Sequence, residues 1–221
     1  AAGAASASGP CSRKVPSAGR VGGCGRPAAA GCYRRKVSDD PLAPALLVAM
    51  PQLLDPNFRR SVVLLLHHDA DFTFGLVLNR PSEIAAESLC ASLGIEWRGA
   101  PAALVAWGGP VQPNTGWVVL GDGAGAELED ATEVTRELHF AGSLETLKHV
   151  EASPPGRLRL FLGYAGWGAG QLESELAQGA WLVAPLEPRF VFEVEAGVMW
   201  AGVLRDLGID PATLVATPGI H

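Results

Sequence analysis

Short hydrophobic runs separated by polar turns dominate the chain from residue 44 onward. Runs rich in valine, leucine and phenylalanine are typical of strands, and they occupy residues 44–54, 61–68, 72–79, 116–121 and 157–164. Only residues 69–71 separate the second run from the third, which predicts an antiparallel hairpin. Weaker or shorter runs are also expected to form strands, at 101–110, 133–142, 180–185 and 189–195.

Fewer segments have the pattern of a helix. Helices are expected over residues 83–93, 143–153, 171–178 and 196–208. Ser82 and Ser143 are the predicted N-caps of the first two, and Gly94 and Gly208 the predicted stops of the first and last. A helical turn is predicted after Asp55, with Pro56 in its first position. Because helices do not alternate regularly with strands, the pattern predicts an α+β fold with a largely antiparallel sheet.

The first 40 residues differ in composition from the rest of the chain. They hold seven Lys and Arg residues and two acidic residues among Ala, Gly, Ser and Pro, with almost no large apolar side chain. Such a segment cannot bury enough apolar surface to offset its ordering entropy. We therefore predict a disordered basic extension at 1–40 and one globular domain at 41–221. The extension is open to three interpretations: an organellar transit peptide, a basic tail that touches RNA or membrane, or an artefact of a wrongly chosen start or of cloning.

The two parts carry opposite charge. The extension has a net charge of +5 and the whole chain −6, so residues 41–221 carry −11. Phosphate contacts need a basic face, so the globular part is not expected to bind nucleic acid directly. No apolar run approaches the roughly 18 residues of a membrane span, and no membrane partner is predicted. Cys90 is the one cysteine of residues 41–221, which fits a reducing compartment.

Glycines crowd residues 163–170, between a predicted strand and a predicted helix. Strand, glycine loop and helix is the layout of many phosphate sites. Here no lysine follows, and Gln171 or Glu173 stands where the dinucleotide fingerprint needs its third glycine. The glycines are therefore predicted to form a tight corner around Trp167 through positive φ angles. Gln171 and Glu173, at the mouth of this corner, remain candidate ligand contacts.

Residues 67–71 contain two histidines and two aspartates, which invites a metal interpretation. Adjacent side chains of a strand point to opposite faces, so His67 and His68 are not expected to share an ion. Neither a G-x-S-x-G nor an S-x-x-K motif is present. No metal, cofactor or catalytic residue is therefore predicted.

Two polar turns, at residues 55–61 and 78–83, mix turn-forming residues with arginines. Asp55, Asn57 and Asn79 are typical of caps and turns. Arg59 and Arg80 could instead form a pocket for an anion or carboxylate, because a guanidinium pairs with both. Both interpretations stay open.

Four phrases of the sequence are distinctive in combination and in their order: LLVAMPQLLDPNFRRSVVLLLHHDADFTFGLVLNRPSE, WGGPVQPNTGWVVL, LFLGYAGWGAGQLESELAQGAWLVAP and LRDLGIDPATLVATPG. Through these phrases, about residues 45–219 resemble the AlgH/YqgE family of bacterial proteins. The resemblance implies a single α+β domain, whose bifurcated, mostly antiparallel sheet folds toward a pseudo-barrel flanked by helices. It also implies a cytosolic bacterial protein or a plastid relative of one.

The resemblance brings little biochemistry. Family members are mostly described as uncharacterised, and one is named as a regulator of alginate production. Gly166 and Gly168 depart from the family, whose loop usually has a residue such as Ser before this tryptophan and Pro or Ala after it. A glycine-rich cradle therefore does not define the family.

Three functional hypotheses follow. The leading one is a non-enzymatic regulatory or interaction protein that acts through a protein partner or a small ligand. The second is an enzyme or small-ligand binder with a pocket near Trp167, Gln171 and Glu173. The third is a transcriptional regulator that binds nucleic acid through the basic extension. The candidate ligand-binding residues are Asp55, Asn57, Arg59, Asn79, Arg80, Trp167, Gln171 and Glu173. A cytoplasmic location is expected, or a plastid if residues 1–40 are a transit peptide, and the partner and oligomeric state stay open.

Overall fold

The computed structural model describes residues 42–142, 144–152 and 156–214. The extension predicted for residues 1–40 and the predicted cap Ser143 lie outside these residues.

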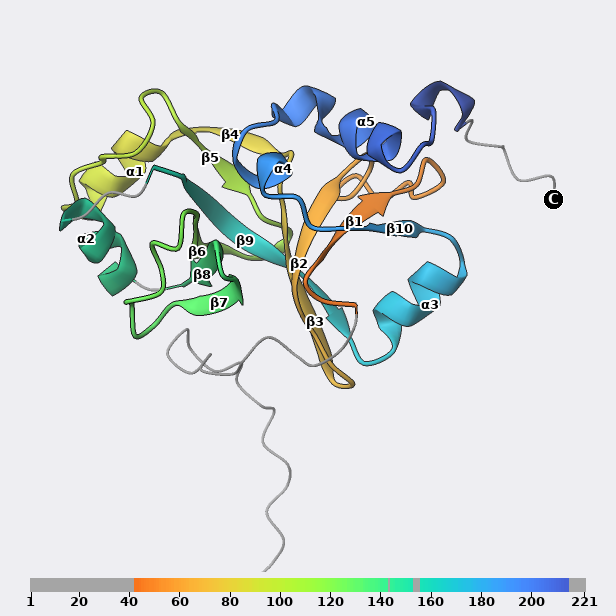
Figure 1. The fold of residues 1–221 in the computed structure, drawn as a ribbon, viewed down its shortest axis with the longest axis horizontal. Helices are drawn as coiled ribbons and strands as arrows, with labels where there is room; N and C mark the ends of the chain where they lie inside the picture. The colour runs from red at the N-terminus through yellow and green to blue at the C-terminus, as the bar shows by residue number, and fades with distance from the viewer. Residues whose placement is uncertain (1–41, 143, 153–155, 215–221) are drawn as a thin grey trace, which may run out of the picture.

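Ten strands form one curled sheet, with helices at both ends and along its outer faces (Figure 1). The main path of hydrogen-bonded neighbours runs β10-β1-β2-β3-β9-β6-β8-β7, and β4 and β5 form a branch. The strands are β1 (Ala45–Ala49), β2 (Val62–His68), β3 (Phe72–Val77), β4 (Pro81–Ala85), β5 (Leu104–Trp107), β6 (Val111–Leu120), β7 (Thr132–Thr135), β8 (Leu138–Ala141), β9 (Leu158–Gly168) and β10 (Trp181–Ala184).

The sheet divides at the long strand β9. The C-terminal part of β9 pairs antiparallel with β3, from Ala165 to Gly168. The earlier residues Phe161 and Leu162 pair in parallel with β5. The other edge of β9 pairs with β6. The β5–β9 pair is the one parallel pairing within the described residues. The predicted α+β class, with a bifurcated and mostly antiparallel sheet that curls into a half-barrel, is confirmed.

Three glycines make this branch point possible. A Cβ atom on Gly108 would lie 2.4 Å from the carbonyl oxygen of Gly163, and one on Gly109 would lie 2.2 Å from the carbonyl carbon of Tyr164. Gly163 itself has a φ of +67°, which side chains disfavour. The two family phrases that contain these glycines therefore meet where three strands diverge.

Five α-helices and one 3₁₀ turn complete the described part of the chain: α1 (Ala86–Ser92), α2 (Leu144–Ala152), α3 (Gln171–Ala177), α4 (Pro188–Phe192), α5 (Ala196–Asp206) and η1 (Pro211–Thr213). In Figure 1, α4 and α5 lie along one side of the sheet and α3 lies beside the ends of β3 and β10. Strands β1 and β2 are buried on both faces. Leu46 and Leu64 belong to the cluster that includes residues of α4 and α5, and Leu47 and Leu65 to the cluster around Trp167.

The strand predicted at 189–195 is wrong, because residues 188–192 form the short helix α4. Pro188 occupies the start of this helix, where its fixed φ is favourable. Phe190 and Val191 are both buried against the core. Adjacent residues of a strand would point to opposite faces, so a helical turn buries this pair more completely.

The start of the first predicted helix is also wrong. Residues 81–85 form β4, and α1 begins at Ala86. Ser82 does not cap the helix; its hydroxyl donates a hydrogen bond to the Val105 carbonyl (2.7 Å) and accepts one from the Ile84 amide (3.0 Å). Pairing with β5 therefore overrides the local helical preference. Gly94 ends α1 with a φ of +74°, as predicted.

The weak strand predicted at 133–142 is a hairpin of two strands, β7 and β8. The corner predicted around Trp167 is wrong, because β9 continues through Gly168 and the chain turns at residues 169–170. Gly170 has the positive φ expected at such a corner, +71°. Trp167 lies inside the strand and is 3 % exposed.

Candidate functional site

The loop at residues 55–61 connects β1 with β2 and is held from within as a turn. Its Asp55 carbonyl accepts hydrogen bonds from the Phe58 and Arg59 amides (2.9 and 2.8 Å), and the Asp55 carboxylate accepts one from the Asn57 amide (2.8 Å). The predicted turn capped by Asp55 is confirmed. The loop then presents Phe58 inward and leaves Arg59 and Arg60 exposed.

Asn79 and Arg80 hold this loop from the neighbouring turn. The Asn79 side chain accepts a hydrogen bond from the Val62 amide and donates one to the Arg60 carbonyl, both at 2.9 Å. The Arg80 guanidinium donates to the Arg59 carbonyl at 2.7 Å and to the Pro56 carbonyl at 3.3 Å. Both residues therefore position the loop through their side chains.

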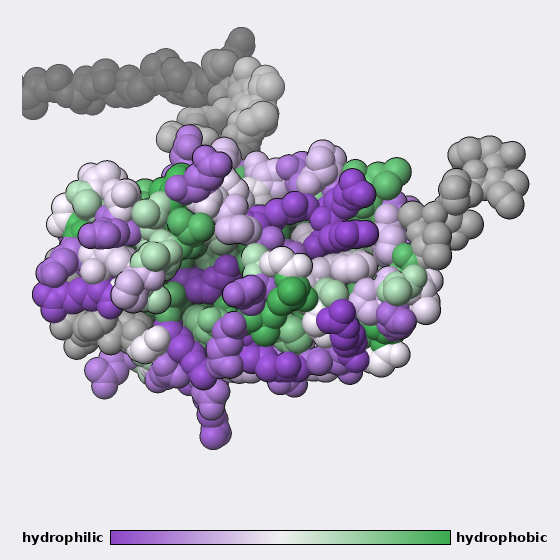
Figure 2. Space-filling model, turned by 90° about the horizontal axis from the view of Figure 1, so that it is seen from above, coloured by the Kyte–Doolittle hydropathy of each residue, from purple (hydrophilic) through white to green (hydrophobic). Residues whose placement is uncertain are grey.

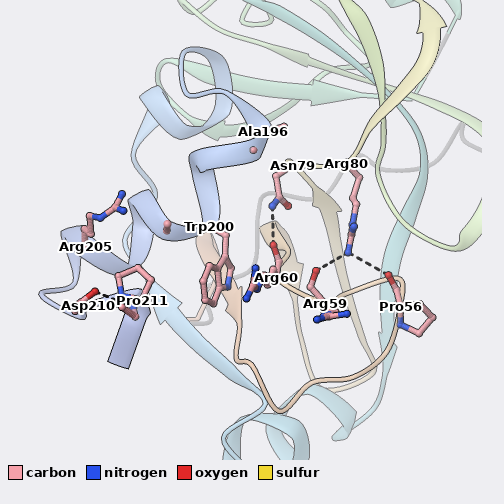
Figure 3. A pocket seen from close by; sticks show the side chains of 13 residues that line it. Pro56, Arg59, Arg60, Asn79, Arg80, Ala196, Trp200, Arg205, Asp210 and Pro211 are labelled. Carbon is pink, nitrogen blue, oxygen red and sulfur yellow. Dashed lines mark hydrogen bonds between the residues drawn. The ribbon is translucent and has the colours of Figure 1, made fainter. Parts of the chain in front are cut away.

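A cavity of about 820 Å³ lies between this loop, the turn at 79–80, helix α5 and η1. We call it the arginine pocket, because its lining includes Arg59, Arg60, Arg80 and Arg205, with Trp200 and Asp210. Figure 3 shows the first three arginines on one wall and Arg205 across the cavity, with Trp200 between Arg60 and Arg205. From the side of α4 and α5, the surface is a mixture of hydrophilic and hydrophobic areas (Figure 2).

The four arginines of the arginine pocket differ in their partners. Arg80 is bound to two carbonyls, and the Arg60 guanidinium lies 5.4 Å from the centre of the Trp200 ring, a cation–π distance. Within the described residues, the guanidinium groups of Arg59 and Arg205 have no hydrogen-bond or ion-pair partner. They are exposed cations that face a shared cavity.

Arg60 adopts an unusual backbone conformation, with a φ of +54°. For a residue other than glycine this costs about 1–2 kcal/mol. The hydrogen bond from Asn79 to the Arg60 carbonyl and the contact with Trp200 hold it in place. Residues kept in such conformations concentrate at functional sites.

A second group of predicted residues lies in what we call the tryptophan cluster, formed by Phe58, Trp167, Gln171, Glu175 and Trp181. One carboxylate oxygen of Glu175 accepts hydrogen bonds from both indole nitrogens, at 3.0 and 2.8 Å. The other carboxylate oxygen accepts a hydrogen bond from the side-chain amide nitrogen of Gln171 at 2.9 Å. The side-chain oxygen of Gln171 in turn accepts one from the backbone amide of Gly168 at 3.2 Å. The Phe58 ring packs on both tryptophans, with ring centres 6.0 and 5.6 Å apart.

Glu173 points to a different neighbour. Its carboxylate lies 3.6 Å from Nε2 of His68, whose Nδ1 lies 2.7 Å from the Thr73 hydroxyl. Hydroxyl, imidazole and carboxylate in this order are the elements of a nucleophilic triad. Thr73 is only 2 % exposed and His68 4 %, so a substrate could not reach the hydroxyl in this conformation. Thr73 is therefore not an accessible nucleophile in this conformation.

The eight candidate residues are thus separated. Arg59, Asn79 and Arg80 line the arginine pocket, whereas Trp167 and Gln171 lie in the tryptophan cluster. Asp55 is used by its own turn, Asn57 lines a smaller neighbouring cavity, and Glu173 is beside His68.

Sequence reasoning missed Arg60, Glu175, Trp200 and Arg205. One signal for the last was available: Gly197, Ala201 and Arg205 recur every four residues, so they share one face of α5, and all three line the arginine pocket.

No three His, Cys, Asp or Glu side chains of the described residues form a group that could hold a metal ion. None of the helices in this part of the chain is both long enough and apolar enough to cross a membrane.

Known proteins similar to this chain show the same architecture. The solution structure of the AlgH protein from Pseudomonas aeruginosa matches with a TM-score of 0.64 at 32% identity, over 85% of this chain and 100% of that one. The crystal structure of protein DIP2367 from Corynebacterium diphtheriae also matches with a TM-score of 0.64, at 29% identity, over 80% of this chain and 91% of that one.

Sequence relatives match about four fifths of the chain. A UPF0301 protein from Myxococcus xanthus is 42% identical over 182 residues, which are 81% of this chain and 98% of that relative. A UPF0301 protein from Anaeromyxobacter sp. strain K is 40% identical over 185 residues, 80% of this chain and 94% of that relative. The family model described as AlgH-like matches residues 46–212. With this match and these relatives, the chain belongs to the AlgH-like family.

Proposed function

We propose that this chain is a regulatory or interaction protein that binds an anionic group of its partner in the arginine pocket. The observation that supports this most is the concentration of positive charge. Four of the ten Lys and Arg residues of 41–221 line one cavity, although this part of the chain has a net charge of −11. Arginine forms paired hydrogen bonds with carboxylates and phosphates, which makes such a cavity suited to anions.

The arginines have two roles in this proposal. Arg59 and Arg205, on opposite sides of the cavity, contact the bound anion. Arg60 and Arg80 are positioning residues, because the contact with Trp200 and the bonds to the Arg59 and Pro56 carbonyls keep the loop in one conformation before the anion arrives. Binding to a loop that is already ordered avoids the entropy cost of ordering it.

The pocket is better suited to binding than to proton transfer. Its lining acid is Asp210, and Oδ1 of Asp210 already accepts a hydrogen bond from the Ala212 amide (3.0 Å). The acidic surroundings also disfavour a long polyanion, since contacts beyond the arginines would meet negative charge. A short acidic group on a protein partner fits both conditions.

The test measures the affinity of a fluorescein-labelled tetra-aspartate peptide by fluorescence anisotropy. We expect Arg59→Ala and Arg205→Ala each to weaken binding about fivefold, which corresponds to about 1 kcal/mol, the upper range for a solvent-exposed ion pair. Binding by the unchanged protein should weaken as salt rises, because exposed charges are screened.

Arg136→Ala is the matched control, because it removes an exposed arginine from the β7–β8 turn, outside the pocket lining. Its affinity should equal that of the unchanged protein. If all four proteins bind the peptide equally, or none binds it, the proposed function is wrong.

A further inference from the structure

A smaller cavity adjoins the arginine pocket. It has a volume of about 310 Å³, and its lining includes Trp107 and four prolines, Pro56, Pro81, Pro110 and Pro113. We call it the tryptophan–proline groove. Pro56 and Arg80 line both cavities, so the two share a wall.

Trp107 is unusual for its exposure. It is 40 % exposed at the end of β5, whereas Trp117, Trp167, Trp181 and Trp200 are each at most 9 % exposed. Tryptophan is enriched at protein interfaces, where its ring is covered and its indole nitrogen can still find a partner. The four prolines of the same lining have fixed φ angles, so their rings offer an apolar wall that loses little entropy on binding.

Asn57 adds a polar group to this groove. Asn57 is among the residues that line the cavity, and its backbone amide is already bound to the Asp55 carboxylate. A carboxamide can both donate to and accept from a peptide group. The groove therefore offers an apolar surface and a partner for peptide backbone, next to a cavity that attracts carboxylates.

We propose that the partner presents an extended acidic peptide that carries one apolar side chain. This rests on the proposed function of the arginine pocket and adds the partner's chemistry. The carboxylates meet Arg59 and Arg205, and the apolar side chain lies on Trp107 between the prolines. Arg80 lies in the shared wall. Its hydrogen bonds to the Pro56 and Arg59 carbonyls fix the position of one cavity relative to the other.

Charge and aromatic content favour a peptide over a nucleic acid. A single strand would need a basic track and several stacking rings, but the groove offers one exposed tryptophan in a domain of net charge −11. A peptide with three or four carboxylates concentrates its charge at the arginines. Its apolar side chain is then buried from water at Trp107, which is favourable in proportion to the area covered.

The test compares two fluorescein-labelled peptides, Asp-Glu-Asp-Glu-Gly-Leu-Gly and the same peptide with glycine in place of leucine. Both are also made in reversed order, because the direction of the bound chain is open. We expect the leucine peptide, in one of the two orders, to bind the unchanged protein about tenfold more tightly than its glycine counterpart.

Substitutions then show which residues cause the difference in affinity between the leucine and glycine peptides. Trp107→Ala should remove the preference for leucine, Trp107→Phe should keep part of it, and Arg205→Ala should weaken both peptides by the same factor. Leu104→Ala is the control, since Leu104 is another exposed apolar residue of β5 (51 %), outside the groove lining. Melting temperatures check that each variant is folded.

The outcomes separate this inference from the proposed function. If both peptides bind with equal affinity while Arg59→Ala and Arg205→Ala still weaken them, the inference is wrong and the proposed function stands. If no acidic peptide binds, both are wrong. If an eight-residue oligothymidine competes more strongly than the leucine peptide, the site takes nucleic acid and the peptide inference is overturned.

Discussion

The tryptophan cluster and the arginine pocket lie on either side of the loop at 55–61, and they differ in how their polar groups are used. In the tryptophan cluster, Glu175 accepts hydrogen bonds from two indoles and from Gln171. In the arginine pocket, Arg59 and Arg205 face the cavity without a partner among the described residues. Satisfied polar groups around buried rings stabilise a fold, whereas unpaired cations around a cavity are available to a ligand.

One loop serves both regions. Phe58 packs into the tryptophan cluster, and its neighbours Arg59 and Arg60 line the arginine pocket. The cluster therefore anchors the loop, and the pocket depends on the anchored loop. Substitutions in the cluster should change the free energy of unfolding, and substitutions of the outward arginines should change binding alone.

The largest effect is expected for Glu175→Ala. The substitution leaves the indole nitrogens of Trp167 and Trp181, which are 3 % and 2 % exposed as residues, without an acceptor. An unsatisfied buried donor costs about 1–3 kcal/mol, so the free energy of unfolding should fall by about 3 kcal/mol in a urea titration. Glu175→Gln keeps an acceptor oxygen and should lose much less.

Glu173→Ala is the matched control for this prediction, because it removes a carboxylate from the same helix. Its nearest partner, Nε2 of His68, is 3.6 Å away and the carboxylate side chain is 49 % exposed. At 3.6 Å, and with the carboxylate half exposed to water, this contact should contribute less than about 1 kcal/mol. If Glu173→Ala costs as much as Glu175→Ala, the tryptophan cluster does not have the stabilising role that we assign to it.

A middle effect is expected for Phe58→Ala, which tests the link between the two regions. The change removes a half-buried ring from Trp167 and Trp181 and should lower the free energy of unfolding by about 2 kcal/mol. Because the loop loses its anchor, binding of the tetra-aspartate peptide should also weaken. Full peptide affinity in a destabilised Phe58→Ala variant would show that the two regions are independent.

A smaller effect on stability is expected for Arg80→Ala, and the smallest for Arg59→Ala. It removes two hydrogen bonds to exposed loop carbonyls, so the free energy of unfolding should fall by about 1 kcal/mol. Binding of the tetra-aspartate peptide should also weaken, because the loop at 55–61 loses the hydrogen bonds that hold it in place. Arg59→Ala should weaken binding with a change in unfolding free energy within about 0.5 kcal/mol, as for other surface substitutions. Urea titration and anisotropy on the same samples distinguish the two arginines.

Much of the fold could be predicted from the sequence, because the central strands are continuous apolar runs. The runs at 61–68 and 72–79 form β2 and β3, and the cap at Asp55 and the helix stop at Gly94 lie where turn chemistry places them. The predictions for residues 81–85 and 189–195 were wrong. Both segments are short, and their local preferences for helix or strand are weak. Pairing with β5 decided the first, and burial of Phe190 beside Val191 decided the second.

The candidate site was predicted only in part. Arg59, Asn79 and Arg80 lie in adjacent turns of a predicted hairpin region, so their proximity follows from local pattern. Arg205 and Trp200 come from a helix more than 100 residues later, and no sequence spacing relates them to the loop at 55–61. Trp200 is fixed there by its indole bond to the Ala49 carbonyl (2.7 Å), a long-range contact.

By itself, the sequence determined the α+β class, the charge of the domain and the turns that hold Asp55 and Asn79, since these depend on composition and on neighbours along the chain. Only the tertiary structure decided which polar residues are used in the fold and which face a cavity. From the sequence, Trp167 and Gln171 were candidate ligand contacts. In the structure, both side chains donate hydrogen bonds to Glu175 and so help to hold the fold together. Arg59 and Arg205 line one cavity because the curled sheet brings α5 beside the loop, and neither guanidinium has a partner among the described residues.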